Sequence, residues 1–288
     1  MEKIPTNYQK SPEKEVFSVL LEAMKNLSSK LQAKTEAGFI DEKGMVVMDK
    51  FSDLANKDIA GHKKLVADSE RFWSGVDDEV TRKNFIENFG FVNETDESIS
   101  KRIEERYHRI KKEGSKVEML ITILLHKGLG EDFTVVRASE YDDFHNGLDN
   151  LIVNRKTGEV IGAFDEIHND ELGKGALKKQ EKILKKTKSG GAKVEYGFTY
   201  SNSKMVKKSL DNIPIFYIPL TSKDMKELIR DMDFNNLDQL NSKEKLYFDN
   251  IIKELSQQND LLLQEKLISP LKNNLLKSRQ IFNQFSSI

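Results

Sequence analysis

The stretch from Phe133 to Ile167, FTVVRASEYDDFHNGLDNLIVNRKTGEVIGAFDEI, decides the fold. Two apolar runs, residues 148–153 and 160–165, flank the polar linker 154–159. Gly158 supplies the positive φ that a short reversal requires, so the pattern predicts a β-hairpin. With Thr157 at its tip, equal spacing places Asp149 directly opposite Asp165.

These two aspartates give the hairpin its chemical interest. Residues that face each other across paired strands have Cβ atoms about 4.5–5.5 Å apart on one face of the sheet. Two carboxylates held at that separation repel each other, and a divalent cation relieves the repulsion. The pattern therefore indicates a metal site at the open end of the hairpin. The simpler interpretation is that both acids end strands and face solvent.

Composition limits the classes of protein that remain. Among 288 residues, 38% are hydrophobic and 32% charged, which is typical of a helix-rich soluble chain. The sequence lacks a long apolar run and a signal-like N-terminus, so we expect no membrane association and a cytoplasmic location. Cysteine is absent, which excludes disulfides and thiolate metal sites. A net charge of −1 argues against general attraction to nucleic acid but leaves a local basic patch open.

The order of the expected elements defines three regions. Residues 1–114 form a helical N-terminal region whose last helix ends near Gly114. Residues 115–235 hold a helix, three strands, a helix over 172–188 and two further strands over 194–200 and 213–220. Residues 236–288 form a C-terminal helical tail that packs on the rest of the chain or on a partner. The helix between the hairpin and the next strand permits parallel pairing, so we predict a mixed α/β (α+β) fold with a mixed sheet.

This succession of helix, β-meander, helix and strand resembles the core of the PD-(D/E)XK nuclease-like superfamily over Ser115 to Leu220. The resemblance depends on Asp149 at the start of the second strand and on Asp165-Glu166 at the end of the third. The stretch 140–143 is also similar to uncharacterised bacterial relatives. The resemblance implies a restriction-endonuclease-like three-layer core that binds Mg²⁺, or Mn²⁺, through Asp149 and Asp165, assisted by Glu118 on the preceding helix and by Glu166. It further implies hydrolysis of phosphodiester bonds in DNA or RNA.

The sequence departs from the superfamily at its lysine. That residue normally lies two positions after the second acid, where it orients or activates the attacking water. Here the position is Ile167, or His168 if the count starts at Glu166. Some relatives carry the lysine on the following helix, so Lys178 and Lys182 are candidates. Other relatives have lost it together with activity, which makes a catalytically inactive binding module the alternative.

Further polar residues lie near these acids. Asp142 and Asp143 either join the site or form a solvated turn in which each bonds its own backbone. His145 and His168 are candidate ligands or proton carriers, since neutral imidazole serves both roles at pH 7. A surface histidine is the simpler interpretation of each.

Seven lysines make the helix over 172–188 a candidate nucleic-acid surface. They form a stripe that can follow phosphates and would give salt-dependent binding without sequence preference. The alternative is a solvated helix whose lysine stems cover apolar surface. No aromatic residues alternate with these lysines, so the helix itself offers no pattern for base stacking. A protein partner or self-association is expected through the C-terminal helices.

Overall fold

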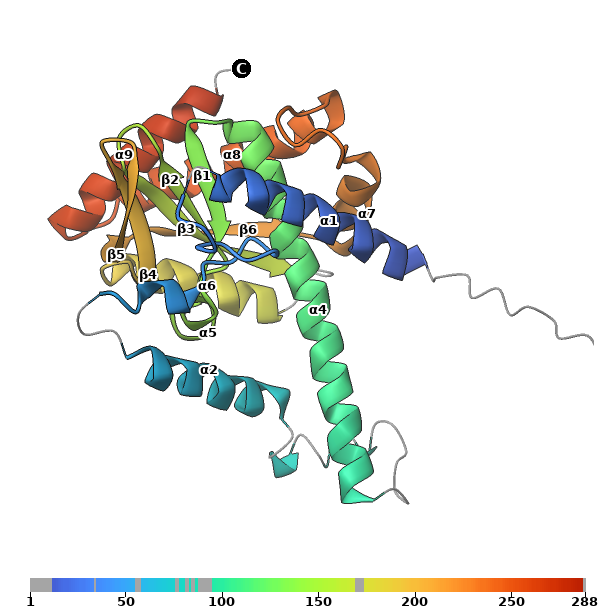
Figure 1. The fold of residues 1–288 in the computed structure, drawn as a ribbon. Helices are drawn as coiled ribbons and strands as arrows, with labels where there is room; N and C mark the ends of the chain where they lie inside the picture. Colours follow the sequence, from blue (N-terminus) through green and yellow to red (C-terminus); the bar gives the residue numbers. More distant parts are fainter. Residues whose placement is uncertain are drawn as a thin grey trace, which may run out of the picture.

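A mixed sheet lies at the centre of the computed structural model, which describes residues 12–33, 35–54, 58–75, 78–80, 83, 86–87, 95–168 and 174–286. Its four strands are β1 (Phe133–Arg137), β2 (Asn150–Asn154), β3 (Val160–His168) and β6 (Ile215–Leu220), in the order β1-β2-β3-β6. The first three pair antiparallel, and β6 runs parallel to β3. The predicted mixed α/β fold with a mixed sheet is confirmed (Figure 1).

Helices cover both faces of this sheet. On one face, Phe164 of β3 lies beside Phe216 of β6, and Phe216 meets Phe282 of α9 (Ser269–Ser286) edge-on, with centroids 5.3 Å apart. Side chains alternate between faces along a strand, so Asp165 projects to the opposite face. There it pairs with Lys179 of α6 (Lys174–Lys188). The sheet thus separates α6 from the layer formed by α9 and α8 (Ser242–Leu263).

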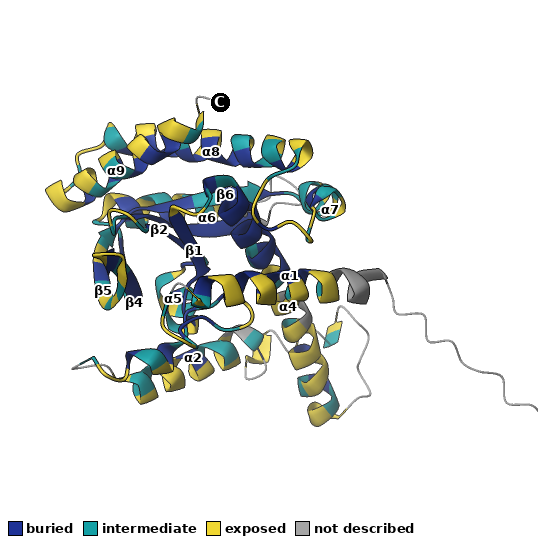
Figure 2. Cartoon of the chain, turned by 45° about the horizontal axis from the view of Figure 1, so that its top comes forward, coloured by how far each residue is buried: buried dark blue, intermediate teal, exposed yellow. Residues whose placement is uncertain are grey.

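The long helix α4 (Asp96–Leu129) crosses the expected boundary at residues 114 and 115 without a break. The predicted helix end at Gly114 is therefore wrong. A glycine inside a helix costs about 1 kcal/mol relative to alanine, and here the apolar stretch that follows outweighs it, because Leu120, Leu124 and Leu125 are fully buried. The first half of α4 extends past the body of the molecule (Figure 1) and is mostly exposed (Figure 2).

The remaining helices surround this centre. They are α1 (Pro12–Gln32), the 3-10 turn η1 (Met48–Phe51), α2 (Ile59–Ser74), α5 (Glu140–Asn146) and α7 (Ser222–Asp231). Helix α5 occupies the acidic segment between β1 and β2. It begins at the cap Ser139, whose hydroxyl accepts the N–H of Asp142, and ends at Gly147, where φ is +58°.

A separate two-stranded sheet consists of β4 (Ala192–Ser201) and β5 (Lys204–Ile213). The first strand was expected, but β5 was not. Its sequence is polar and rich in lysine, so it lacks the apolar pattern by which a strand is predicted. Asn202 and Ser203 connect the strands with φ of +50° and +61°, the conformation of a tight hairpin turn. This ribbon lies against the closed end of the β2–β3 hairpin, where the Thr199 hydroxyl donates to the carbonyl of Gly158.

Side chains cover the outer edge of β6. The Thr187 hydroxyl bonds both the N–H and the carbonyl of Ile215. One step along, the amide of Gln258 accepts from the N–H of Tyr217 at 2.9 Å and donates to its carbonyl at 2.8 Å. Pro219, the next residue with this orientation, has no N–H to offer.

The expected C-terminal tail forms a layer of the fold. Its helices α8 and α9 turn their buried faces to the sheet and their exposed faces to solvent (Figure 2). A buried ion pair also joins α8 to α4, because Lys127 Nζ lies 2.5 Å from Glu244 Oε1 and both side chains are fully buried.

Candidate metal centre

The β2–β3 hairpin sets the register that brings the two predicted ligands together. Asn150 pairs with Phe164 and Leu151 with Ala163, so the next residues outward, Asp149 and Asp165, oppose each other. The expected symmetry about Thr157 holds at this end, although a bulge between Ile152 and Val153 shifts the pairing nearer the turn. The two carboxylates therefore share the face of the sheet that α6 covers.

Backbone and side-chain bonds hold Asp149 firmly in place. Its N–H donates to the carbonyl of Phe164 and its carbonyl accepts the N–H of Ala138, both at 2.8 Å. Its carboxylate Oδ2 accepts the backbone N–H of Glu166 at 2.7 Å. The backbone of Asp149 is thus held by its neighbours on both sides, and its carboxylate is oriented by β3.

Lys179 supplies the cation of the site. Its ammonium pairs with Asp165 Oδ1 and donates to the carbonyl of Glu166 at 2.8 Å. Burial alone would lower the pKa of Lys179, but the negative charges of Asp149 and Asp165 outweigh burial and raise it. Lys179 therefore remains protonated beside the two acids.

The surroundings of Asp165 disfavour the ionised form of its carboxyl. Burial first, and then the charge of Asp149, raise its pKa to about 8, although Lys179 opposes the shift. The side chain is 9% exposed. Despite the lysine, Asp165 therefore retains its proton up to about pH 8 in the ion-free chain.

Glu166 lies behind the pair on the opposite face of β3. Its Oε1 accepts from the Asn150 amide at 2.6 Å, and the Asn150 carbonyl oxygen accepts the Thr122 hydroxyl of α4, also at 2.6 Å. Its Oε2 is buried and finds no hydrogen-bond partner among the described residues. Burial and the charge of Asp149 raise the pKa of Glu166 well above its ordinary value.

Glu118 lies near the pair but is bound to another residue. Its carboxylate forms a salt bridge with Arg137 at the end of β1, where the arginine side chain is 4% exposed. Burial raises the pKa of Glu118, Arg137 opposes the rise and Asp149 adds to it. The predicted helper thus belongs to the same electrostatic cluster, with one oxygen committed to Arg137.

The structure brings Lys179 to the acids in place of the two lysines that the sequence suggested. Lys178 and Lys182 are exposed on the outer side of α6. Lys179 lies four residues before the buried Ile183 and is therefore on the inner side of the helix. Leu177, although apolar, is 48% exposed and lies beside Lys178 on the outer side. Helix phase, with Ile183 as the reference, is the signal that identifies Lys179.

The neighbouring acids have separate roles. Asp142 is fully buried and accepts from Ser139, Asn146 and the backbone N–H groups of Glu195 and Tyr196, so it joins α5 to β4. The solvated-turn interpretation is therefore wrong for Asp142. Asp143 belongs to the cluster, because burial and the charges of Asp149 and Glu118 raise its pKa well above the ordinary value.

The two candidate histidines differ in what the structure describes. His145 is exposed and stacks on Tyr141 within α5, with ring centroids 4.8 Å apart. His168 ends β3 opposite Leu220, and its side chain lies outside the described residues.

The donor set suits a hard cation. Among the described residues, no three His, Asp or Glu side chains form a group that could hold an ion. Two opposed carboxylates are nevertheless enough for Mg²⁺, which commonly takes one or two from the protein and completes its octahedron with water and substrate phosphate. The raised pKa of Asp165 fits such an ion, because a bound cation would displace the proton that the pair retains without it.

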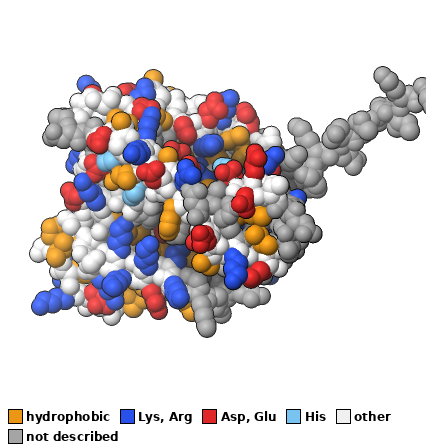
Figure 3. Space-filling view, turned by 90° about the horizontal axis from the view of Figure 1, so that it is seen from below, with side chains coloured by type: hydrophobic (Ala, Val, Ile, Leu, Met, Phe, Trp, Pro, Cys, Tyr) orange, Lys and Arg blue, Asp and Glu red, His pale blue; other side chains and the backbone are white. Residues whose placement is uncertain are grey.

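The lysine-rich helix α6 presents its exposed side next to this site. Lys178, Lys182 and Lys185 are exposed, whereas Lys186 turns inward and donates to the carbonyl of Asn146 at the end of α5. Seen from below, several Lys and Arg side chains lie close together in the lower half of the molecule, with acidic side chains among them (Figure 3). The basic stripe and the carboxylate pair therefore belong to adjoining parts of the fold.

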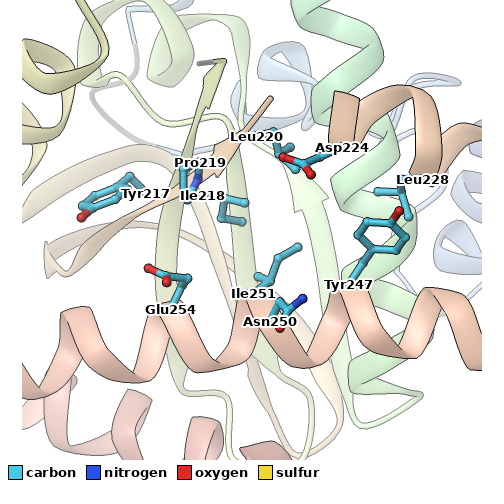
Figure 4. A pocket seen from close by; sticks show the side chains of 10 residues that line it. All are labelled: Tyr217, Ile218, Pro219, Leu220, Asp224, Leu228, Tyr247, Asn250, Ile251 and Glu254. Carbon is cyan, nitrogen blue, oxygen red and sulfur yellow. The ribbon is translucent and has the colours of Figure 1, made fainter. Parts of the chain in front are cut away.

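A pocket of about 200 Å³ lies elsewhere, between β6, α7 and α8 (Figure 4). Its lining includes Ile218, Leu220, Leu228 and Ile251. The carboxylate of Asp224, also in the lining, is engaged in the capping box with Thr221. The two acids of its lining, Asp224 and Glu254, come from different helices and are not opposed as in the hairpin, so the candidate chemistry lies at Asp149 and Asp165.

Comparison with known proteins leaves the interpretation to this geometry. No family model matches the chain, and neither a curated protein nor a solved structure matches it. Within the described ranges, no helix combines the length and apolar character needed to cross a membrane.

Proposed function

We propose that this chain is a metal-dependent nuclease that hydrolyses phosphodiester bonds in DNA or RNA. The observation that carries the proposal is the facing pair Asp149 and Asp165, with Lys179 reaching the same face from α6. A lysine beside paired acids is the combination that the PD-(D/E)XK resemblance implies, supplied here from the helix after the third strand.

The order of the elements supports the same proposal. Helix α4 precedes the meander β1–β2–β3, α6 follows it, and β6 then pairs parallel with β3. We interpret the layers of α6, sheet and α8–α9 as the three-layer core of a restriction-endonuclease-like fold. Helix α5 and the β4–β5 ribbon are additions to that core.

Each residue of the site has a defined role in the proposed reaction. Asp149 and Asp165 hold Mg²⁺ or Mn²⁺, and the bound ion supplies a polarised phosphoryl oxygen and a water of lowered pKa. Lys179 orients the attacking water and offsets negative charge at the reacting phosphate. Glu166 acts as a positioning residue, since its backbone N–H fixes Asp149 and its carboxyl is held by Asn150.

The exposed lysines of α6 provide the proposed contact to the nucleic-acid backbone. Lys178, Lys182 and Lys185 make salt-dependent contacts to phosphates and do not read sequence. A local stripe of this kind is compatible with the near-neutral chain, because the field close to a surface depends on the nearest charges.

A cleavage assay tests the proposal directly. Pure protein is incubated with plasmid and with single-stranded DNA or RNA in Mg²⁺ or Mn²⁺, and products are followed over time. We expect Asp149→Ala and Asp165→Ala each to lower the rate at least 100-fold. Asp132→Ala, which removes an exposed acid paired with Lys156 near the closed end of the hairpin, should leave it unchanged. Cleavage that persists in both site variants overturns the assignment.

Substitutions of two adjacent lysines test the role of Lys179. Lys179→Met should lower the turnover number about 10²–10³-fold, the range for loss of one group that stabilises transition-state charge. Lys178→Met, one residue away but on the exposed side of α6, should affect substrate affinity more than turnover. Equal losses of turnover in both variants would contradict a specific role for Lys179.

A catalytically inactive binding module is the second candidate. It is favoured by Ile167 at the usual lysine position and by Glu118 being held by Arg137. Calorimetry with Mg²⁺ separates the candidates without an activity assay. Heat of binding that disappears in Asp149→Asn supports the nuclease, whereas equal traces for the two proteins favour the inactive module.

A further inference from the structure

We propose that a stack of three aromatic rings near the carboxylate pair Asp149 and Asp165 binds an unpaired base, so that the substrate is single-stranded nucleic acid. The ring stack consists of His62 from α2 and Tyr141 and His145 from α5. His62 and Tyr141 are 4.0 Å apart between centroids at 23°, and Tyr141 and His145 are 4.8 Å apart at 29°. This inference rests on the proposed function and names its substrate class.

The buried end of the ring stack is fixed before any ligand arrives. His62 Nδ1 lies 2.7 Å from the hydroxyl of Tyr196, a fully buried residue of β4. Asp142 holds the same part of the fold together, because it accepts the N–H of Tyr196 at 2.9 Å. Rings held in this way lose little conformational freedom on binding, which favours affinity.

The other end of the ring stack reaches solvent. His62 and Tyr141 are half-buried, and His145 is exposed. The His145 ring has one further contact, 3.5 Å from Nε2 to the hydroxyl of Ser69. Packing accounts for the buried rings but does not require a third aromatic ring at the surface. A nucleobase can continue the series on His145, since every base has a π-face.

The ring stack lies near the carboxylate pair along the chain. His145 and Asp149 are four residues apart, so their Cα atoms lie within about 14 Å of each other. Gly147 between them has φ of +58°, and a Cβ built there would meet nothing within 4 Å. At the same end of α5, Lys186 of the basic helix contacts Asn146. A nucleic-acid strand whose phosphates lie along α6 can therefore place one phosphate at Asp149 and a neighbouring base on His145.

Stacking on His145 requires a base that is free of its own partner. In a duplex both faces of each base are covered by its neighbours, whereas a single strand offers unstacked bases to protein rings. The geometry therefore favours single strands over duplexes.

Binding of labelled 12-nucleotide single strands tests this inference in Mg²⁺, in an Asp149→Asn background that blocks the proposed cleavage. We expect His145→Ala to weaken binding about 10-fold, within the range for loss of one base–aromatic contact. His145→Phe should restore binding, because it keeps a ring. His108→Ala is the matched control, an exposed histidine ten residues before Glu118 on α4. Circular dichroism and thermal melting of each variant verify folding.

Two comparison ligands make the outcome specific. The His145→Ala loss should vanish for an abasic strand of the same length and for a blunt duplex. Unchanged binding in His145→Ala, failure of His145→Phe to restore it, equal losses for single strand and duplex, or no binding of single strands would each overturn the proposal. Cleavage that depends on Asp149, together with normal binding in His145→Ala, would retain the nuclease and remove the ring stack from it.

Discussion

Two buried groups of charges in this fold are built in opposite ways. Lys127 and Glu244 form a balanced pair, in which Glu244 also accepts the N–H groups of Asp233 at 2.9 Å and Asn241 at 2.7 Å. At the open end of the hairpin, Asp149, Asp165 and Glu166 lie around the ammonium of Lys179, yet the pKa values of Asp165 and Glu166 are raised. The first group satisfies its charges within the chain, whereas the second favours protonated carboxyls that a bound cation would ionise. The difference separates a structural ion pair from a candidate site.

The largest expected effect tests the balanced pair. Glu244→Ala leaves the Lys127 ammonium buried without its carboxylate, so we expect a loss of about 3–5 kcal/mol in the free energy of unfolding. Urea denaturation measures it. Asp260→Ala, which removes an exposed acid paired with Arg279, should cost no more than about 1 kcal/mol. Equal losses in the two variants would mean that burial does not distinguish these pairs.

At the hairpin, in contrast, we expect removal of an acid to raise the free energy of unfolding. Asp165→Asn keeps the shape of the side chain and cannot ionise. The wild-type carboxyl, in contrast, ionises at pH 7 mainly on unfolding, which favours the unfolded state. In metal-free protein at pH 7 we expect the variant to be more stable by about 2–4 kcal/mol, since each pKa unit corresponds to about 1.4 kcal/mol. Urea denaturation in chelator gives the value. A variant less stable than the wild type would show that Lys179 already balances the site.

The same group predicts a pH dependence. The pKa of Asp165 is about 8 in the folded chain and 3.8 for an ordinary aspartate, so between these values the folded state binds more protons than the unfolded state. The contribution of Asp165 to stability therefore falls as pH rises from about 4 to about 8. Unfolding free energies at pH 5 and pH 8 should show a steeper fall in the wild type than in Asp165→Asn. Parallel profiles would contradict the assignment.

The smallest expected effect is the stabilisation of the fold by Mg²⁺, which should distinguish the two charge groups. Mg²⁺ at ten times its dissociation constant should stabilise the wild type by about 1.4 kcal/mol. Asp149→Asn should lose this gain, whereas Glu244→Ala should keep it, because its charge group is satisfied inside the fold. Thermal melting with and without Mg²⁺ measures the difference. A gain of the same size in Asp149→Asn would place the ion elsewhere.

The parts of the fold that local pattern determines could be predicted from the sequence. The two apolar runs on either side of the linker with Gly158 predict the hairpin. The expected register brings Asp149 opposite Asp165, which pairing at Asn150 and Phe164 supports. The intervening helix permits the parallel pairing that the sheet shows, although the strand that pairs with β3 is β6 and not β4, the next along the chain. A polar strand such as β5 has no apolar alternation, and the Asn202-Ser203 turn was its one usable signal.

The rest depends on contacts between distant segments. Lys179 could have been separated from Lys178 and Lys182 by helix phase, because Ile183 marks the inner side of α6. No local pattern predicts that Glu118 meets Arg137, since that contact depends on how α4 packs on β1. The ring stack likewise depends on the packing of α2 against α5, which brings His62 to Tyr141.

The covered edge of β6 limits how other chains can approach this protein. An extended peptide or a second copy joins a sheet by bonding to free N–H and carbonyl groups along an outer strand. Here the groups of Ile215 and Tyr217 are already engaged by Thr187 and Gln258, and Pro219 has no N–H. Strand addition is thereby blocked along this edge, which also protects the sheet from edge-to-edge aggregation. A protein partner on this side would meet helix surfaces.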